Sequence, residues 1–93
     1  MSYNINIDLC QQVAFTSDGS TASSAVVGSQ HLVLYATADC FINAGTSPTA
    51  AASGAGSVFL PANTFFEISV GLNYKLAARA VSTSGTLYIN PLL

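Results

Sequence analysis

Apolar and polar side chains alternate with a period of two over several short stretches of the chain, which is typical of β-strands with one buried face. The first stretch spans residues 3–9, where polar residues separate four apolar ones: Tyr3, Ile5, Ile7 and Leu9. The pattern predicts a half-buried strand that opens the domain. Residues 11–15 are predicted to continue this strand or to pair beside it.

The most apolar run covers residues 31–37, and its β-branched and aromatic content predicts a central strand covered on both faces. Asp39 interrupts the run, and alternation resumes over residues 40–44. The two segments are therefore predicted to form a hairpin that turns at Ala38 and Asp39.

Four more strands are predicted in the second half of the chain, the last of them at residues 86–89. Residues 57–60 form a short strand because Pro61 ends the apolar run. The strand predicted from residues 64–70 carries on one face Phe66, Ile68 and Val70, and on the other Phe65 and Glu67. Residues 74–81 could form a helix by alanine content, but the flanking turns favour a strand. Its apolar face consists of Leu76, Ala78 and Ala80.

Turn-forming residues separate these segments. Residues 16–21 contain an Asp-Gly pair, which is suited to a tight reversal of the chain. Residues 46–56 have side chains too small to build a core, so an exposed loop is predicted there. Residues 82–85 predict a hairpin loop that leads to a strand at 86–89. Residues 1–93 are thus predicted to form a single all-β domain, a small β-sandwich or jelly-roll-like barrel of about seven to eight short antiparallel strands. Residues 1–10 would serve as an N-terminal strand or arm in subunit contacts.

Composition adds a preference for assembly. Only 6% of the 93 residues are charged, against about 25% in an ordinary soluble protein, and 51% are hydrophobic. A domain of this size buries only about 60–65% of the surface of its unfolded chain. Few charges also leave little repulsion between copies. Size and composition therefore favour an oligomer or a docked subunit.

Composition also excludes several classes of function. Mean hydropathy is +0.51, yet polar residues interrupt every stretch before about 18 apolar residues accumulate, so no transmembrane helix is predicted. Residues 1–6 lack the basic start and apolar core of a secretory signal, so we expect a protein made in the cytoplasm. The net charge is −2, with Lys75 and Arg79 as the only basic side chains, which argues against nucleic acid as a partner.

Candidate chemistry is sparse. Cys10 and Cys40 have no CxxC spacing, and one histidine is too few for a zinc site. Two buried thiols are favoured, and a disulfide is the alternative. His31 is interpreted as a hydrogen-bonded or solvated residue at a strand end rather than as a base or metal ligand. No nucleophile motif or metal-ligand spacing occurs, so we predict no enzyme, no cofactor and no metal.

Two further groups of side chains have alternative interpretations. Glu67 is expected to pair with Lys75 or Arg79 on a neighbouring strand, either as a surface salt bridge or as a pair that fixes the register between subunits. Four tyrosines could provide a sugar-stacking platform, although core or rim packing is favoured for most of them. They are Tyr3, Tyr35, Tyr74 and Tyr88.

A resemblance emerges when the segments are taken in order. LVLYATADCFINAGTSPTA (residues 32–50), VFLPA (58–62), FEI (66–68), YKLAA (74–78) and SGTLYI (84–89) resemble a succession found in small virion proteins of tailed bacteriophages. Each segment alone is generic, and their order over residues 30–89 carries the resemblance. It implies a β-sandwich on the capsid, acting as a decoration or cement subunit and often as a symmetric oligomer. It supplies no catalytic motif.

The expected function is that of a non-enzymatic virion protein at the capsid surface, made in the host cytoplasm. Its partners would be copies of itself, with a trimer favoured, and the major capsid protein, without nucleic acid or membrane. The candidate subunit contacts are Tyr3, Ile5, Ile7, Leu9, Glu67, Lys75 and Arg79. The alternatives are a tail or head-fibre component of the virion and a carbohydrate-binding module.

Overall fold

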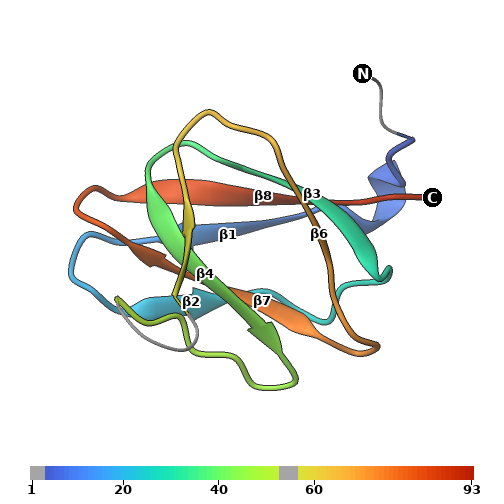
Figure 1. The fold of residues 1–93 in the computed structure, drawn as a ribbon, viewed down its shortest axis with the longest axis horizontal. Helices are drawn as coiled ribbons and strands as arrows, with labels where there is room; N and C mark the ends of the chain where they lie inside the picture. The colour runs from blue at the N-terminus through green and yellow to red at the C-terminus, as the bar shows by residue number, and fades with distance from the viewer. Residues whose placement is uncertain (1–3, 53–56) are drawn as a thin grey trace.

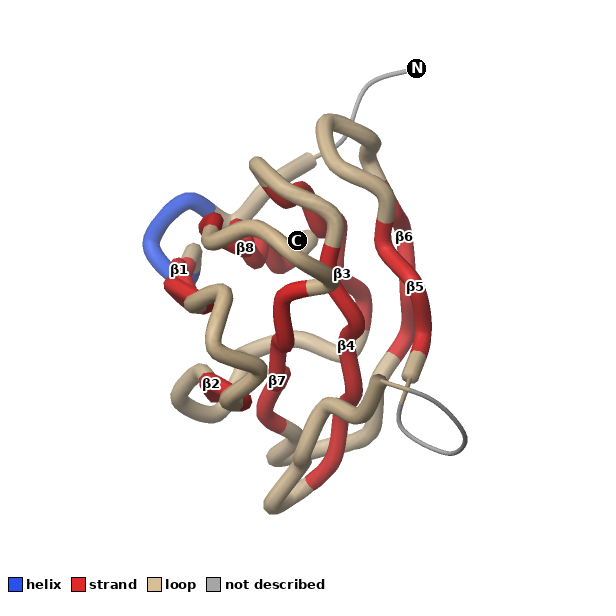
Figure 2. Tube along the Cα trace, turned by 90° about the vertical axis from the view of Figure 1, so that its left-hand side faces the viewer, coloured by secondary structure: helices blue, strands red, loops and turns tan. Residues whose placement is uncertain are grey.

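The computed structural model describes residues 4–52 and 57–93, which form two four-stranded antiparallel sheets (Figure 1). The first sheet has the order β1 (Gln11–Phe15), β8 (Gly85–Pro91), β3 (His31–Ala36), β6 (Phe66–Ser69). The second sheet has the order β2 (Thr21–Ser23), β7 (Lys75–Ala80), β4 (Cys40–Gly45), β5 (Val58–Leu60). A 3₁₀ turn, η1 (Ile7–Leu9), precedes β1 and lies against β8 (Figure 2).

The strand pairing follows one rule. β1 pairs with β8, β2 with β7, β3 with β6 and β4 with β5, so the chain is one long antiparallel hairpin folded at the β4–β5 connection. The hairpin is rolled up, because β8 also pairs with β3 and β7 with β4. This arrangement is an eight-stranded jelly roll, and it confirms the predicted all-β sandwich.

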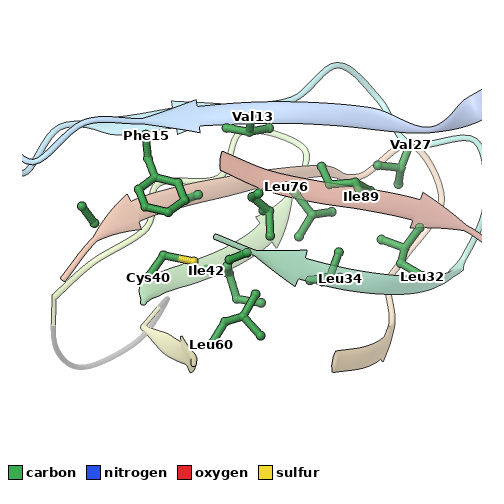
Figure 3. Close-up of a cluster of buried hydrophobic side chains, with 14 residues drawn as sticks. Val13, Phe15, Val27, Leu32, Leu34, Cys40, Ile42, Leu60, Leu76 and Ile89 are labelled. Atoms are coloured by element: carbon green, nitrogen blue, oxygen red, sulfur yellow. The ribbon is translucent and has the colours of Figure 1, made fainter. Parts of the chain in front are cut away.

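The core lies between the two sheets (Figure 3). Alternate residues of each strand point inward, and the predicted apolar faces of β6 and β7 are confirmed. The largest side chains of the core cluster that are fully buried are Phe15, Leu32, Leu34, Leu60, Leu76, Leu87 and Ile89. The accessible surface of 5004 Å² matches the roughly 5,000 Å² expected of a folded monomer of 9.5 kDa. The single chain therefore exposes no more surface than an ordinary folded monomer of its mass.

Both hairpins predicted from short turns are wrong. β3 and β4 flank the turn at Ala38 and Asp39 but lie in different sheets, and so do β7 and β8 on either side of residues 81–84. Residues 16–20 likewise connect β1 to β2 across the sandwich. A short polar turn suits a chain that crosses between sheets as well as one that reverses within a sheet. Among the strands of residues 4–52 and 57–93, those adjacent in sequence therefore pair only at β4 and β5.

The N-terminal strand predicted over residues 3–9 is also wrong. Ile5 makes an isolated bridge to Leu92, the Asn6 N–H donates to the Pro91 carbonyl at 2.8 Å, and regular pairing starts only at Gln11. Between the pairs Ile5–Leu92 and Gln11–Ile89 the N-terminal side has five residues, 6–10, against two, 90 and 91. The excess forms η1, which turns Ile7 out to solvent.

The outer faces of the two sheets differ. Residues 46–52 pack on the second sheet, where the Ala50 N–H donates to Thr21 Oγ1 at 3.2 Å and Asn43 Nδ2 donates to the Thr49 carbonyl at 3.1 Å. Ala50 and the outward-facing Ala77 are buried as a result. The loop predicted to be exposed over 46–56 is thus partly packed, and residues 53–56 lie outside the described residues.

Candidate functional site

Four segments meet at the end of the sandwich that carries both chain termini, at the right of Figure 1. They are η1, residues 24–30, residues 70–74 and residues 92–93, and we call this region the terminal end. The Val70 N–H donates to the Gln30 carbonyl at 2.7 Å, and the Val27 N–H donates to the Tyr74 carbonyl at 2.9 Å. These backbone hydrogen bonds fix the second and third segments against each other.

The remaining segments are joined to them by side chains. Ser29 Oγ donates to the Leu92 carbonyl at 3.1 Å, and Gln11 holds residues 25 and 26 through both of its amide atoms. Leu9 packs on Gly28, where an added Cβ would lie 2.6 Å from Leu9 Cδ1. The terminal end is therefore an ordered surface built from segments far apart in sequence.

Apolar side chains gather on this surface. Ile7 is 80% exposed, Leu72 73% and Leu93 85%, and Leu9 and Val26 are exposed to a lesser degree. A hollow of about 370 Å³ lies between residues 26–30 and 71–73. The arrangement offers apolar contact area and a concavity for a protruding side chain, and the titratable side chains in its four segments are Asp8 on η1 and Tyr74.

The predicted contact residues are spread over the molecule. Ile7 and Leu9 lie in the terminal end, Ile5 is half-buried beside β8, and Tyr3 lies outside the described residues. Of these four, only Ile7 and Leu9 are exposed among the described residues.

The expected salt bridge of Glu67 with Lys75 or Arg79 on a neighbouring strand of the same chain is wrong, whereas a pair between subunits stays a prediction. Glu67 is on β6 in the first sheet, opposite Val33, whereas both basic residues are on β7 in the second sheet. Arg79 instead lies under the turn at Gly19, whose added Cβ would be 3.3 Å from the guanidinium. The chain crosses between sheets after β6, which separates residues that are close in sequence.

The two cysteines are free and occupy different environments. Cys10 is exposed, which corrects the prediction of two buried thiols, and Cys40 is buried at the start of β4. Burial, and secondarily the negative charge of Asp39, raises the pKa of the Cys40 thiol to about 11. The alternative of a disulfide does not hold in this structure.

His31 is a hydrogen-bonded residue at a strand end, as predicted. It begins β3, is exposed, and its Nδ1 lies 3.0 Å from Ser69 Oγ on the paired strand β6. Over residues 4–52 and 57–93, no group of three or more His, Cys, Asp or Glu side chains is placed to hold a metal ion. In the part of the chain that the structure describes, no helix is long and apolar enough to cross a membrane.

Two of the four tyrosines come together. Tyr35 on β3 and Tyr88 on β8 are directly opposite in the first sheet, on its outer face, and both are half-buried. Tyr74 lies elsewhere, with its ring against Gly71 in the turn before β7. Sequence patterns could not bring Tyr35 and Tyr88 together, because the register of β3 against β8 joins residues 53 positions apart.

A second hollow, of about 260 Å³, lies in the seam between β6 and the second sheet. Its lining is mainly apolar and includes Ile42, Val58, Phe66, Ile68 and Val70. The volume is below the range of about 300–1,000 Å³ typical of small-molecule sites. We therefore assign no ligand to the seam.

Comparison with known proteins adds no assignment. No family model matches the sequence, and searches of the curated proteins and of the solved structures return no match.

Proposed function

We propose that this protein is a non-enzymatic structural subunit of a tailed-bacteriophage virion, a decoration or cement protein that binds across major capsid proteins and stabilises the head. The observation that carries the proposal is the terminal end, where Ile7, Leu72 and Leu93 from three segments are mostly exposed. Removing apolar surface from water stabilises a contact by about 25 cal/mol per Å². Docking of this end on another subunit would therefore be favourable.

The resemblance of residues 30–89 to small virion proteins supports the same role. Jelly rolls also recur in viral capsid domains, although the fold supports the proposal by analogy only. The scarcity of charge fits a subunit held in an assembly, because few charged groups would lose hydration when an interface forms.

The N-terminal residues would contact the partner subunit through η1 and not as a free strand. Residues 4–6 are tied to the end of β8, so Ile7 and Leu9 would meet the partner from η1. A specific interface covers about 800 Å² on each partner, roughly a sixth of the 5004 Å² surface of this chain. A symmetric homo-oligomer, with a trimer favoured, would repeat such a contact and add affinity through multivalency.

The first test is the number of copies of this chain per purified virus particle, measured by quantitative mass spectrometry. We expect hundreds of copies, because a decoration subunit covers the whole shell. A handful of copies would overturn the decoration role in favour of a tail or head-fibre component. Absence from particles would overturn the virion role altogether.

The docking surface is tested with a matched pair of variants. The double variant Ile7→Ser, Leu72→Ser should lower occupancy on particles at least tenfold while the thermal unfolding temperature changes little, since both side chains are exposed. Val81→Ser changes an exposed apolar residue at the opposite end and should retain full occupancy. Equal occupancy of the two variants would contradict docking through the terminal end.

A further inference from the structure

Three aromatic side chains form a row across the outer face of the first sheet. Tyr88 on β8 is directly opposite Tyr35 on β3, and the β3–β6 register, continued by one residue, places Phe65 on the other side of Tyr35. Two strand spacings of about 4.8 Å make this aromatic row about 10 Å long. Phe65 is 63% exposed, and both tyrosines are half-buried.

The orientation of the rings is fixed by contacts within the row. The Tyr35 and Phe65 ring centroids are 5.1 Å apart at an interplanar angle of 48°. The Tyr35 hydroxyl donates to Asn63 Oδ1 at 2.9 Å, and Asn63 itself is held in a turn with a φ of 59°. A preorganised row loses little side-chain entropy when it binds a ligand.

Uncharged polar groups and one carboxylate surround the row. Gln12 on β1 extends it past Tyr88, and its side chain is exposed. Thr86 lies two residues before Tyr88 on the same face, and Glu67 lies two residues after Phe65. Both basic residues of the chain, Lys75 and Arg79, are on β7 in the other sheet.

We propose that this face binds a neutral saccharide chain, with the aromatic row as the stacking platform. The face of an aromatic ring carries negative partial charge and attracts the C–H groups of a sugar ring. Gln12 and Thr86 can donate to and accept from sugar hydroxyls, and Glu67 can accept from them. Both Lys75 and Arg79 are on the other sheet, and Glu67 adds a negative charge to this one, which disfavours phosphate, sulfate and other anionic ligands. The exposed His31 lies on the same face two positions beyond Val33, with its Nδ1 3.0 Å from Ser69 Oγ.

A saccharide fits this face better than a protein subunit does. The row is narrow and bordered by hydrogen-bonding side chains, whereas the terminal end carries five exposed aliphatic residues: Ile7, Leu9, Val26, Leu72 and Leu93. Residues 46–52 cover part of the other sheet, whereas on this face Phe65 and Gln12 are exposed and Val33, next to Tyr35 on β3, is buried. The proposal is independent of docking at the terminal end, so a subunit on a particle could hold both contacts.

The probes are cellohexaose, maltohexaose and a printed array of neutral bacterial polysaccharides. Amide chemical shifts of the ¹⁵N-labelled protein are followed during titration with the hexasaccharides and with every polysaccharide that binds on the array. We expect at least one probe to bind with a dissociation constant of about 1 mM or tighter, and to shift the amides of Gln12, Tyr35 and Tyr88.

Matched variants assign the binding to the row. Phe65→Ala should weaken binding at least fivefold, and Tyr88→Ala at least tenfold. Phe59→Ala removes an equally paired aromatic residue from the outer face of the second sheet, 6.1 Å from Phe41 between ring centroids, and should bind as the unmodified chain does. Because Phe65 precedes β6 and is exposed, its variant tests the row even if Tyr88→Ala fails to fold.

Three outcomes would overturn the proposal. The first is that no probe on the array binds. The second is that shifts map to the second sheet or the terminal end, or that Phe65→Ala and Phe59→Ala bind equally well. The third is a concentration-dependent shift of the row amides without any saccharide, which would assign the face to a contact between copies of the chain. Loss of particle occupancy in the Ile7→Ser, Leu72→Ser variant should leave saccharide binding unchanged.

Discussion

The two ends of the sandwich are built on opposite principles. At the end away from the termini, polar side chains hydrogen-bond within a turn or to the neighbouring turn: Asp18 accepts from the Thr16 and Ser20 hydroxyls at 2.7 Å, and Ser84 Oγ accepts from the Ser17 N–H at 2.9 Å. At the terminal end, backbone hydrogen bonds and the side chains of Ser29 and Gln11 hold the segments together, but Ile7, Leu72 and Leu93 extend into solvent.

The difference separates folding from binding. A turn whose polar groups are satisfied within the chain gains nothing from a partner. Exposed apolar side chains on an ordered surface contribute little to the stability of the monomer and gain free energy only on contact. The polar end therefore completes the fold, and the terminal end is the surface that we assign to assembly.

The largest expected effect in this comparison is a difference in reactivity between the two cysteines, one at each end of the sandwich. Cys10 follows η1 at the terminal end and is exposed, whereas Cys40 is buried where the chain enters β4 at the polar end. Since the pKa of Cys40 rises from 9.0 to about 11, its thiolate is about a hundredfold scarcer than that of an ordinary thiol near pH 8.

Iodoacetamide should therefore modify Cys10 quickly in the folded protein and Cys40 at least a hundredfold more slowly, with both modified in denaturant. Mass spectrometry of digested samples taken over time measures the two rates separately. Similar rates at the two positions in the folded protein would show that the β4 end of the core is open to reagents.

Two glycines allow the same substitution to be made at each end. A Cβ added at Gly85 would lie 2.9 Å from Ala38 Cβ, Phe15 Cζ and Thr37 Oγ1; the Ala38 methyl group cannot rotate away, and Phe15 is buried in the core. Gly85→Ala should lower the free energy of unfolding by about 1–3 kcal/mol.

Gly28→Ala is the matched change at the terminal end. Its Cβ meets the flexible tip of Leu9, which is exposed and can rotate away, so the expected change is within about 0.5 kcal/mol. Urea unfolding followed by circular dichroism measures both variants. An equal loss in the two would mean that Leu9 is packed as firmly as the core.

The alternation of side chains predicted strands where β1 and β3 to β8 lie, missed β2, gave a strand over residues 3–9 where η1 lies, and predicted the strand partners poorly. The inward faces of β6 and β7 follow directly from spacing at Phe66 and Ile68, and at Leu76 and Ala78. Neither the hairpin at Asp39 nor the pairing of Glu67 with Lys75 holds, because a turn of a few polar residues carries no information on whether the chain stays in its sheet.

The candidate sites show the same limit. The sequence identifies Ile7 and Leu9 as contact residues, but it places them in a predicted strand, whereas the structure places them in η1. Leu72 and Leu93 are isolated apolar residues in polar or terminal segments, and only the fold brings their segments to the terminal end. The aromatic row likewise depends on the registers of β8 with β3 and of β3 with β6, which no local pattern specifies.

The smallest expected effect concerns the polar end alone. Hydrogen bonds from Ser20 and then Thr16 lower the pKa of the Asp18 carboxyl from 3.8 to about 2, so folding favours its ionised form. The stability from this group is fully present above about pH 4 and is lost as pH falls through 2. Asp18→Asn should be slightly less stable than the unmodified chain at pH 6, and the difference should shrink towards pH 2.

Urea unfolding at both pH values measures this difference, and a ¹³C NMR titration of the carboxyl group measures the pKa directly. Ser20→Ala is the control, because losing its hydroxyl donor should bring the Asp18 pKa back towards 3.8 while the charge stays in place. A stability difference that is constant from pH 6 to pH 2 would mean that the turn is held by its neutral hydrogen bonds. The polar end would then be closed by geometry alone, and the contrast with the terminal end would not depend on charge.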